Sequence, residues 1–125
     1  MQPEVRRIVA VEAHRRRSGR CPKRIYSLGT GETFDIAPEG DGFTDLTTGL
    51  RASIENGMIR LSDGLGPVDL RLTGDVGFDG FDHGGNEPFS GRAGGGASVT
   101  LYERGQADYF QYAVVADGDP APTAR

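Results

Sequence analysis

Glycine content constrains the fold of this chain more than any other feature of its sequence. Twenty of the 125 residues are glycine, more than twice the average share of about 7%. Glycine weakens helices but readily adopts the positive φ angles that tight turns require. Because no Gly-X-Y period is present, the excess predicts many short strands joined by many turns and not a collagen-like helix.

Alternation of apolar and polar residues marks the expected strands. The clearest signal is the segment 51–62, in which Asn56-Gly57 fits the type I′ turn of a two-residue hairpin. With these two residues as the loop, Ile54 faces Ile59 and Ala52 faces Leu61, so one face of the hairpin is apolar. Further strands are expected over residues 25–28, 33–36, 43–46, 68–73, 98–102 and 110–114.

This pattern predicts a mainly β fold. We expect an antiparallel β-sandwich, jelly roll or barrel of about seven to eight short strands, with a basic N-terminal helix or arm. The length of 125 residues suits a single domain. The expected organisation is a basic arm or helix over residues 1–24, a β domain over 25–116 and a flexible tail over 117–125.

The N-terminal segment is ambiguous in its secondary structure. Pro3 and Gly19 fit the start and end of a helix, whereas the β-branched content of residues 3–17 also fits a strand. We expect a helix or an extended arm outside the main sheet. Residues 1–25 carry eight basic and two acidic side chains, against six and sixteen in the rest of the chain. Such asymmetry favours contact with another copy, while the alternative is that the arm folds back on its own acidic body.

The candidate binding residues follow from this charge pattern and from the exposed aromatic groups expected near the end of the chain. Basic side chains neutralise phosphates or pair with acidic protein surfaces, and tyrosine is enriched at interfaces. The candidates are Arg15, Arg16, Arg17, Arg20, Lys23, Arg24, Tyr109 and Tyr112.

Residues 79–96 are expected to form a long glycine-rich loop, a length that is usually functional or mobile. Calcium prefers several oxygen ligands on such a loop, which makes Asp75, Asp79 and Asp82 weak candidates for a metal site. Neither a calcium-binding motif nor a zinc spacing is present, so no cofactor is expected and Asp-Gly turn chemistry is the simpler interpretation. His14 and His83 are expected at the surface or in loops.

The sequence favours a binding or assembly role over catalysis. It contains neither a nucleophile elbow nor a phosphate-binding loop. We expect a non-catalytic module that contacts other copies of itself or other protein subunits, for example as a structural or decorating subunit of a virion or appendage. The alternatives are a module that binds carbohydrate or another ligand through residues 79–96, with or without calcium, and a small enzyme. Nucleic-acid contact through the basic arm also remains open.

The expected location follows from the absence of two signals. The sequence has no apolar segment of signal-peptide or transmembrane length. We therefore expect no membrane contact and a cytoplasmic protein, or part of a particle that assembles in the cytoplasm.

Overall fold

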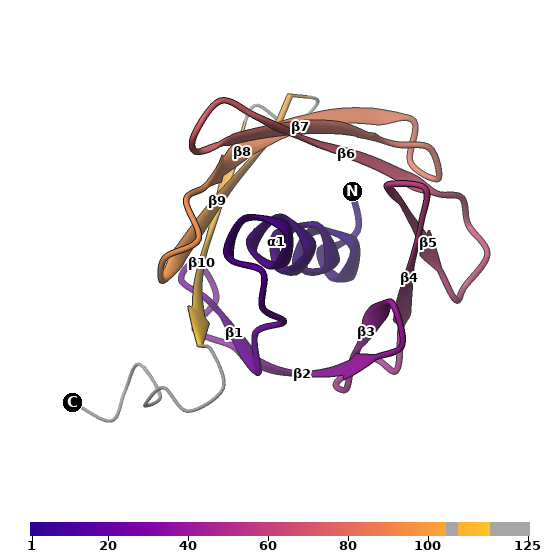
Figure 1. Cartoon of the computed structure of the whole chain (residues 1–125), viewed down its shortest axis with the longest axis horizontal. Coiled ribbons are helices and arrows are strands. Elements are labelled where there is room, and N and C mark those ends of the chain that lie inside the picture. Colours follow the sequence, from indigo (N-terminus) through magenta and orange to yellow (C-terminus); the bar gives the residue numbers. More distant parts are fainter. Residues whose placement is uncertain (105–107, 116–125) are drawn as a thin grey trace.

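A computed structural model describes residues 1–104 and 108–115 and contains one helix and ten strands (Figure 1). The strands form a closed antiparallel barrel in which sequence neighbours pair and β1 closes the ring against β10. The strands are β1 (Arg24–Ser27), β2 (Thr33–Glu39), β3 (Gly42–Asp45), β4 (Arg51–Glu55), β5 (Met58–Leu61), β6 (Val68–Thr73), β7 (Gly77–Asp82), β8 (Glu87–Ala93), β9 (Ser98–Glu103) and β10 (Asp108–Val115).

The mainly β prediction is confirmed, but the finer prediction needs correction. Of the three expected architectures the structure has the barrel and not the sandwich or jelly roll, and it has ten strands and not seven or eight. Within the described residues every strand pairs with a neighbour on each side, so no strand lies at the edge of an open sheet. The expected tail over 117–125 lies outside the described residues.

The N-terminal segment forms helix α1 (Pro3–Ser18), which lies inside the barrel and not outside the sheet (Figure 1). Every residue from 7 to 14 is buried, so the helix is enclosed on all sides over two turns. A barrel of about eight strands is filled by its own side chains, and ten strands enclose a wider lumen. The helix fills this lumen. Within the described residues, no helix combines the length and apolar character needed to cross a membrane.

Apolar side chains from both components form one core. Phe43, Phe78 and Leu101 point inward from the strands and are essentially inaccessible to water. Ile8 and Val9 of the helix are equally buried, and both belong to the same apolar cluster. Burial of this surface stabilises the helix inside the barrel, because apolar area removed from water contributes about 25 cal/mol per Å².

The hairpin predicted around Asn56-Gly57 is confirmed in detail. Asn56 and Gly57 have φ angles of 53° and 79°, as a type I′ turn requires. Strands β4 and β5 pair Ile54 with Ile59 and Ala52 with Leu61.

The predicted long loop over 79–96 is wrong. Most of this segment forms the paired strands β7 and β8, which are joined by residues 83–86. Only residues 94–97 connect β8 to β9.

The up-and-down order of the strands places successive turns at alternate ends of the barrel. The β1–β2, β3–β4, β5–β6 and β7–β8 turns surround the first residues of α1, and we call this end the helix-start mouth. The β2–β3, β4–β5, β6–β7 and β8–β9 turns surround the last residues of α1, and we call that end the helix-end mouth. Two pockets and most of the exposed apolar side chains lie at these two mouths.

Candidate functional site

Some basic side chains of the N-terminal segment pair with acidic residues inside the barrel. Arg7 pairs with the fully buried carboxylate of Asp45 at 3.0 Å, and its guanidinium stacks over Phe34 at 3.7 Å from the ring centroid. Arg6 pairs with Glu103, which is also fully buried. These contacts agree with the alternative in which the basic arm folds back on its own acidic body.

The amino group of Met1 completes an ionic cluster near the helix-start mouth. It lies 2.5 Å from Glu87 Oε2 and 2.7 Å from Glu103 Oε1. Burial lowers the pKa of this amino group, but the hydrogen bonds to Glu103 and Glu87 outweigh burial and leave the pKa raised. The hydrogen bond from the Met1 amino group lowers the pKa of Glu87. The cluster thus holds both groups in their charged forms.

Three consecutive arginines at the end of α1 tie three turns of the helix-end mouth to the helix. Arg15 donates to the carbonyl of Asp41 at 2.8 Å, in the β2–β3 turn. Arg16 donates to the carbonyl of Gly57 at 2.8 Å, in the β4–β5 turn. Arg17 donates to carbonyls on both sides of the β6–β7 turn and at the end of β8: those of Gly74, Gly77 and Ala93.

A buried acid holds two of these arginines in place. Glu12 is 1% exposed, and its two carboxylate oxygens accept hydrogen bonds from Arg15 at 2.8 Å and Arg16 at 2.7 Å. Charge-assisted bonds of this kind are stronger than neutral ones. Because these guanidinium groups already bond to the protein itself, they are poorly placed to bind an external partner.

The remaining basic candidates are more accessible. Arg24 pairs with Asp35 at 2.8 Å on the outer face of the barrel. Arg20 and Lys23 are exposed in the connection between α1 and β1. Their side chains make no hydrogen bond or ion pair within the described residues. Among the residues that the structure describes, Arg20 and Lys23 are therefore two unpaired cations at the helix-end mouth.

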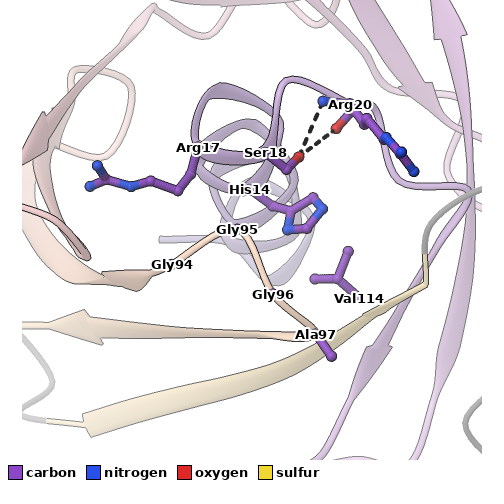
Figure 2. Close-up of a pocket in the computed structure, with 9 residues that line it drawn as sticks. All are labelled: His14, Arg17, Ser18, Arg20, Gly94, Gly95, Gly96, Ala97 and Val114. Carbon is purple, nitrogen blue, oxygen red and sulfur yellow. Dashed lines mark hydrogen bonds between the residues drawn. The ribbon is translucent and has the colours of Figure 1, made fainter.

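A pocket of about 470 Å³ opens at the helix-end mouth (Figure 2). It lies between the end of α1 and the β8–β9 turn, and no carboxylate contributes to its described lining. His14 belongs to this lining and is 4% exposed, so it is not the surface histidine expected from the sequence. Its Nδ1 is buried and has no hydrogen-bond partner within the described part of the chain. Burial lowers the pKa of the imidazole and favours its neutral form.

A second pocket, of about 500 Å³, opens at the helix-start mouth and has the opposite charge character. Its lining includes four acidic residues and one arginine, Arg6, whose guanidinium pairs with the carboxylate of Glu103. The four acids are Glu4, Asp63, Asp82 and Glu87. The linings of the two pockets thus differ in charge: one is acidic, and the other contains no carboxylate within the described residues.

Exposed apolar side chains also gather at the mouths. Leu28, Leu46 and Leu65 lie in three different turns of the helix-start mouth and are 53%, 58% and 68% exposed. Tyr109, near the start of β10, is 65% exposed. At the helix-end mouth, the large exposed apolar residues are Leu72 and Val76. Exposed apolar groups that gather in one region commonly mark an interaction surface.

The two candidate tyrosines have different environments. Tyr109 lies on the outside of the barrel with its ring 4.7 Å from that of Tyr102. Tyr112 instead points into the barrel and is 5% exposed. Burial raises the pKa of Tyr112 to about 12. The expectation that Tyr112 shares the exposed face is therefore corrected, because residues three apart on a strand point to opposite sides.

The structure does not bring the three candidate metal ligands together. Asp79 pairs with Arg71 on the outer face of β7 at 3.1 Å, while Asp82 points inward and accepts the amide of Gly84. Asp75 lies in the β6–β7 turn, at the other mouth from Asp82. Among residues 1–104 and 108–115, no three potential ligands are grouped closely enough to hold a metal ion.

Sequence reasoning missed the residues that connect the helix to the barrel. Asp45 and Glu103 were counted among the acids of the body, yet both point inward. Glu103 continues the inward series of Val99 and Leu101, so strict alternation contained the signal. No family model matches the chain, and no curated protein or solved structure was found that matches it.

Proposed function

We propose that this protein is a non-catalytic assembly module in which the helix-start mouth of one copy binds the helix-end mouth of the next. The observation that carries the proposal is the distribution of exposed groups. The helix-start mouth combines exposed leucines with acidic side chains, and the helix-end mouth combines exposed apolar residues with free cations. A structural or decorating subunit of a larger particle is one concrete form of this role.

The shape of the barrel supports contacts through its mouths. Helix α1 occupies the lumen, so the interior is unsuited to hold a large ligand of the kind that open barrels enclose. Each strand that the structure describes already has a neighbour on both sides, which disfavours addition of a partner strand. Binding energy must therefore come from side chains on the mouths or the outer wall.

The expected contact combines apolar anchors with charge pairing. Leu46 and Leu65 of one copy would bury their side chains against Leu72 and Val76 of the next, a gain of about 0.8 kcal/mol per buried CH₂ group. Exposed ion pairs contribute little individually, but they set orientation and association rate. Because the two binding surfaces are different, the contact is head to tail and builds chains or rings.

Solution mass measured by light scattering at low and high salt tests the proposal. We expect oligomers whose mass grows with concentration at low salt and falls in 0.5 M salt, where the screening length is below about 5 Å. Leu46→Gln/Leu65→Gln alters only the helix-start mouth, and Arg20→Gln/Lys23→Gln alters only the helix-end mouth. Each double variant should be monomeric. The control Arg71→Gln/Arg92→Gln removes the same number of charges from the outer wall and should still assemble.

Mixing the two double variants distinguishes a head-to-tail contact from a contact between two identical mouths. Each variant retains one intact mouth, so an equimolar mixture should form a dimer that neither variant forms alone. A symmetric contact between identical mouths would give no dimer across the two variants. A wild-type chain that is monomeric under all conditions, or variants that assemble like wild type, would overturn the proposal.

A further inference from the structure

The helix-end mouth has one sector that the arginines of α1 leave open. Arg15, Arg16 and Arg17 bond to the three preceding turns and to the last residue of β8. The β8–β9 turn that follows consists of three glycines and an alanine, residues 94–97, and therefore has almost no side chains to fill the space. The pocket of about 470 Å³ lies between this turn and the helix (Figure 2).

His14 gives this pocket a polar group that the fold itself does not use. Figure 2 shows its ring extending from α1 toward the glycine turn and Val114. A buried polar atom without a partner costs about 1–3 kcal/mol, so native structures nearly always satisfy it. The unpartnered Nδ1 of His14 thus points to a ligand or to a small rearrangement that accompanies binding.

Besides His14, the side chains with polar groups in the lining are Arg17, Ser18 and Arg20, and none of them is a carboxylate. Within the described residues, the amides of Gly95 and Gly96 donate no backbone hydrogen bond. Gly95 has a φ of 85°, a conformation in which successive amides in a turn can face one anion. Arg20 lines the rim, and its exposed side chain points away from His14 in Figure 2. Rotation about its side-chain bonds would bring the guanidinium over the opening.

We infer that this pocket binds a small organic molecule that carries an oxyanion group, either a carboxylate or a phosphate monoester. The oxyanion would accept hydrogen bonds from the His14 ring and the glycine amides and would pair with Arg20. Val114 and Ala97 supply an apolar wall for the carbon part of the ligand. The volume lies within the range of about 300–1,000 Å³ that is typical of small-molecule sites and exceeds what a bare ion needs. This inference concerns one copy of the chain, but it shares Arg20 with the proposed assembly surface.

Titration of the isotopically labelled full chain by NMR tests the inference, with butyrate, acetate and inorganic phosphate as separate probes. We expect saturable shifts confined to the amides of Gly95 and Gly96 and to the His14 ring. Binding of butyrate more tightly than acetate identifies a carboxylate ligand with an apolar part. Binding of phosphate more tightly than both carboxylates identifies a phosphate ester. Each anion bound beside the imidazole should also raise the pKa of His14.

Two variants separate a built site from general attraction of anions to a basic surface. Arg20→Gln should weaken binding by at least fivefold, and His14→Gln should abolish the confined shifts. Arg92→Gln, which removes a cation from the outer face of β8, should leave binding unchanged. Shifts that rise linearly without saturation, or equal losses in the Arg20 and Arg92 variants, would overturn the inference. The Arg20 comparison does not depend on the buried His14 and so remains valid if His14→Gln fails to fold.

Discussion

The phenyl ring of Phe78 on β7 lies against Gly91, its cross-strand partner on β8. A Cβ atom on Gly91 would overlap Cζ of this ring and the carbonyl oxygen of Thr100. The neighbouring pair has the reverse arrangement, with the phenylalanine on β8 and the glycine on β7. The Cζ atom of Phe89 lies 2.5 Å from the position that a Cβ atom on Gly80 would occupy. The two rings lie 6.4 Å apart. These glycines are therefore packing residues of the barrel interior.

Gly91→Ala should destabilise the barrel, because the added methyl group has no space between the ring and the backbone. Overpacking of a filled core costs about 1–3 kcal/mol of unfolding free energy. Gly29→Ala is the control, since a Cβ atom there meets nothing within 4 Å and the backbone has no positive φ. Urea denaturation of both variants measures the difference. Equal stability of the two variants would show that the ring moves aside without strain.

These two phenylalanine–glycine pairs explain why the sequence pattern predicts too few strands. Residues 79–96 contain enough glycine to be interpreted as a loop, and this interpretation removed β7 and β8 from the count. Gly80 and Gly91 are present because an aromatic ring needs their space and not because the chain turns there. Propensity describes a residue's own backbone preference, whereas here the cross-strand neighbour decides.

The interior helix was ambiguous in the sequence for a related reason. A surface helix shows an apolar stripe, but α1 is enclosed over residues 7–14 and so carries apolar residues on every side. The local hairpin signal at Asn56-Gly57 predicted its register correctly, because that register depends only on adjacent residues. Closure of the barrel and insertion of the helix depend on contacts far apart in the chain, such as Arg7 with Asp45. The basic cluster was visible in the sequence, but its internal partners were not.

Removal of the Asp45 charge should destabilise the protein strongly. Asp45→Asn leaves the guanidinium of Arg7 buried without a counterion, and breaking a buried pair in this way typically costs about 3–5 kcal/mol. Asp79→Asn breaks the exposed pair with Arg71 and should change stability by less than about 1 kcal/mol. Chemical denaturation measures both effects.

Replacement of both Arg7 and Asp45 distinguishes the cost of an unpaired buried charge from the cost of lost packing. Arg7→Met/Asp45→Leu keeps apolar volume and removes both charges, so it should be more stable than Asp45→Asn. A double variant less stable than the single one would show that packing around Arg7, including its contact with Phe34, is the larger contribution.

Arg17 should control local opening of the helix-end mouth. Its guanidinium makes three hydrogen bonds to carbonyls around the β6–β7 turn and the end of β8. Hydrogen bonds to a charged group contribute about 1.5–3 kcal/mol, so Arg17→Gln should speed exchange of the Ala93 amide, which donates to the carbonyl of Val76 at this turn, by about tenfold or more. Arg92→Gln alters an exposed arginine of the outer wall and should leave this exchange unchanged. Faster exchange spread evenly over all strands would instead indicate global destabilisation.

His14 should make stability depend on pH below neutrality. Burial lowers the pKa of the folded-state imidazole below the ordinary value of 6.5, so the unfolded chain binds the proton more readily. As the pH falls below about 7, unfolding free energy should fall by up to about 1.4 kcal/mol per pH unit, until the folded-state imidazole itself is protonated. The Met1 amino group, whose pKa is raised from 8.0, contributes stability that is lost as the pH rises above about 7, and Glu87, whose pKa is lowered from 4.5, contributes stability that is lost below about pH 5.5. Urea denaturation between pH 5.5 and 7 measures the slope, which His14→Gln should remove and His83→Gln should retain. A slope that survives in His14→Gln would mean that another group titrates in the folded barrel.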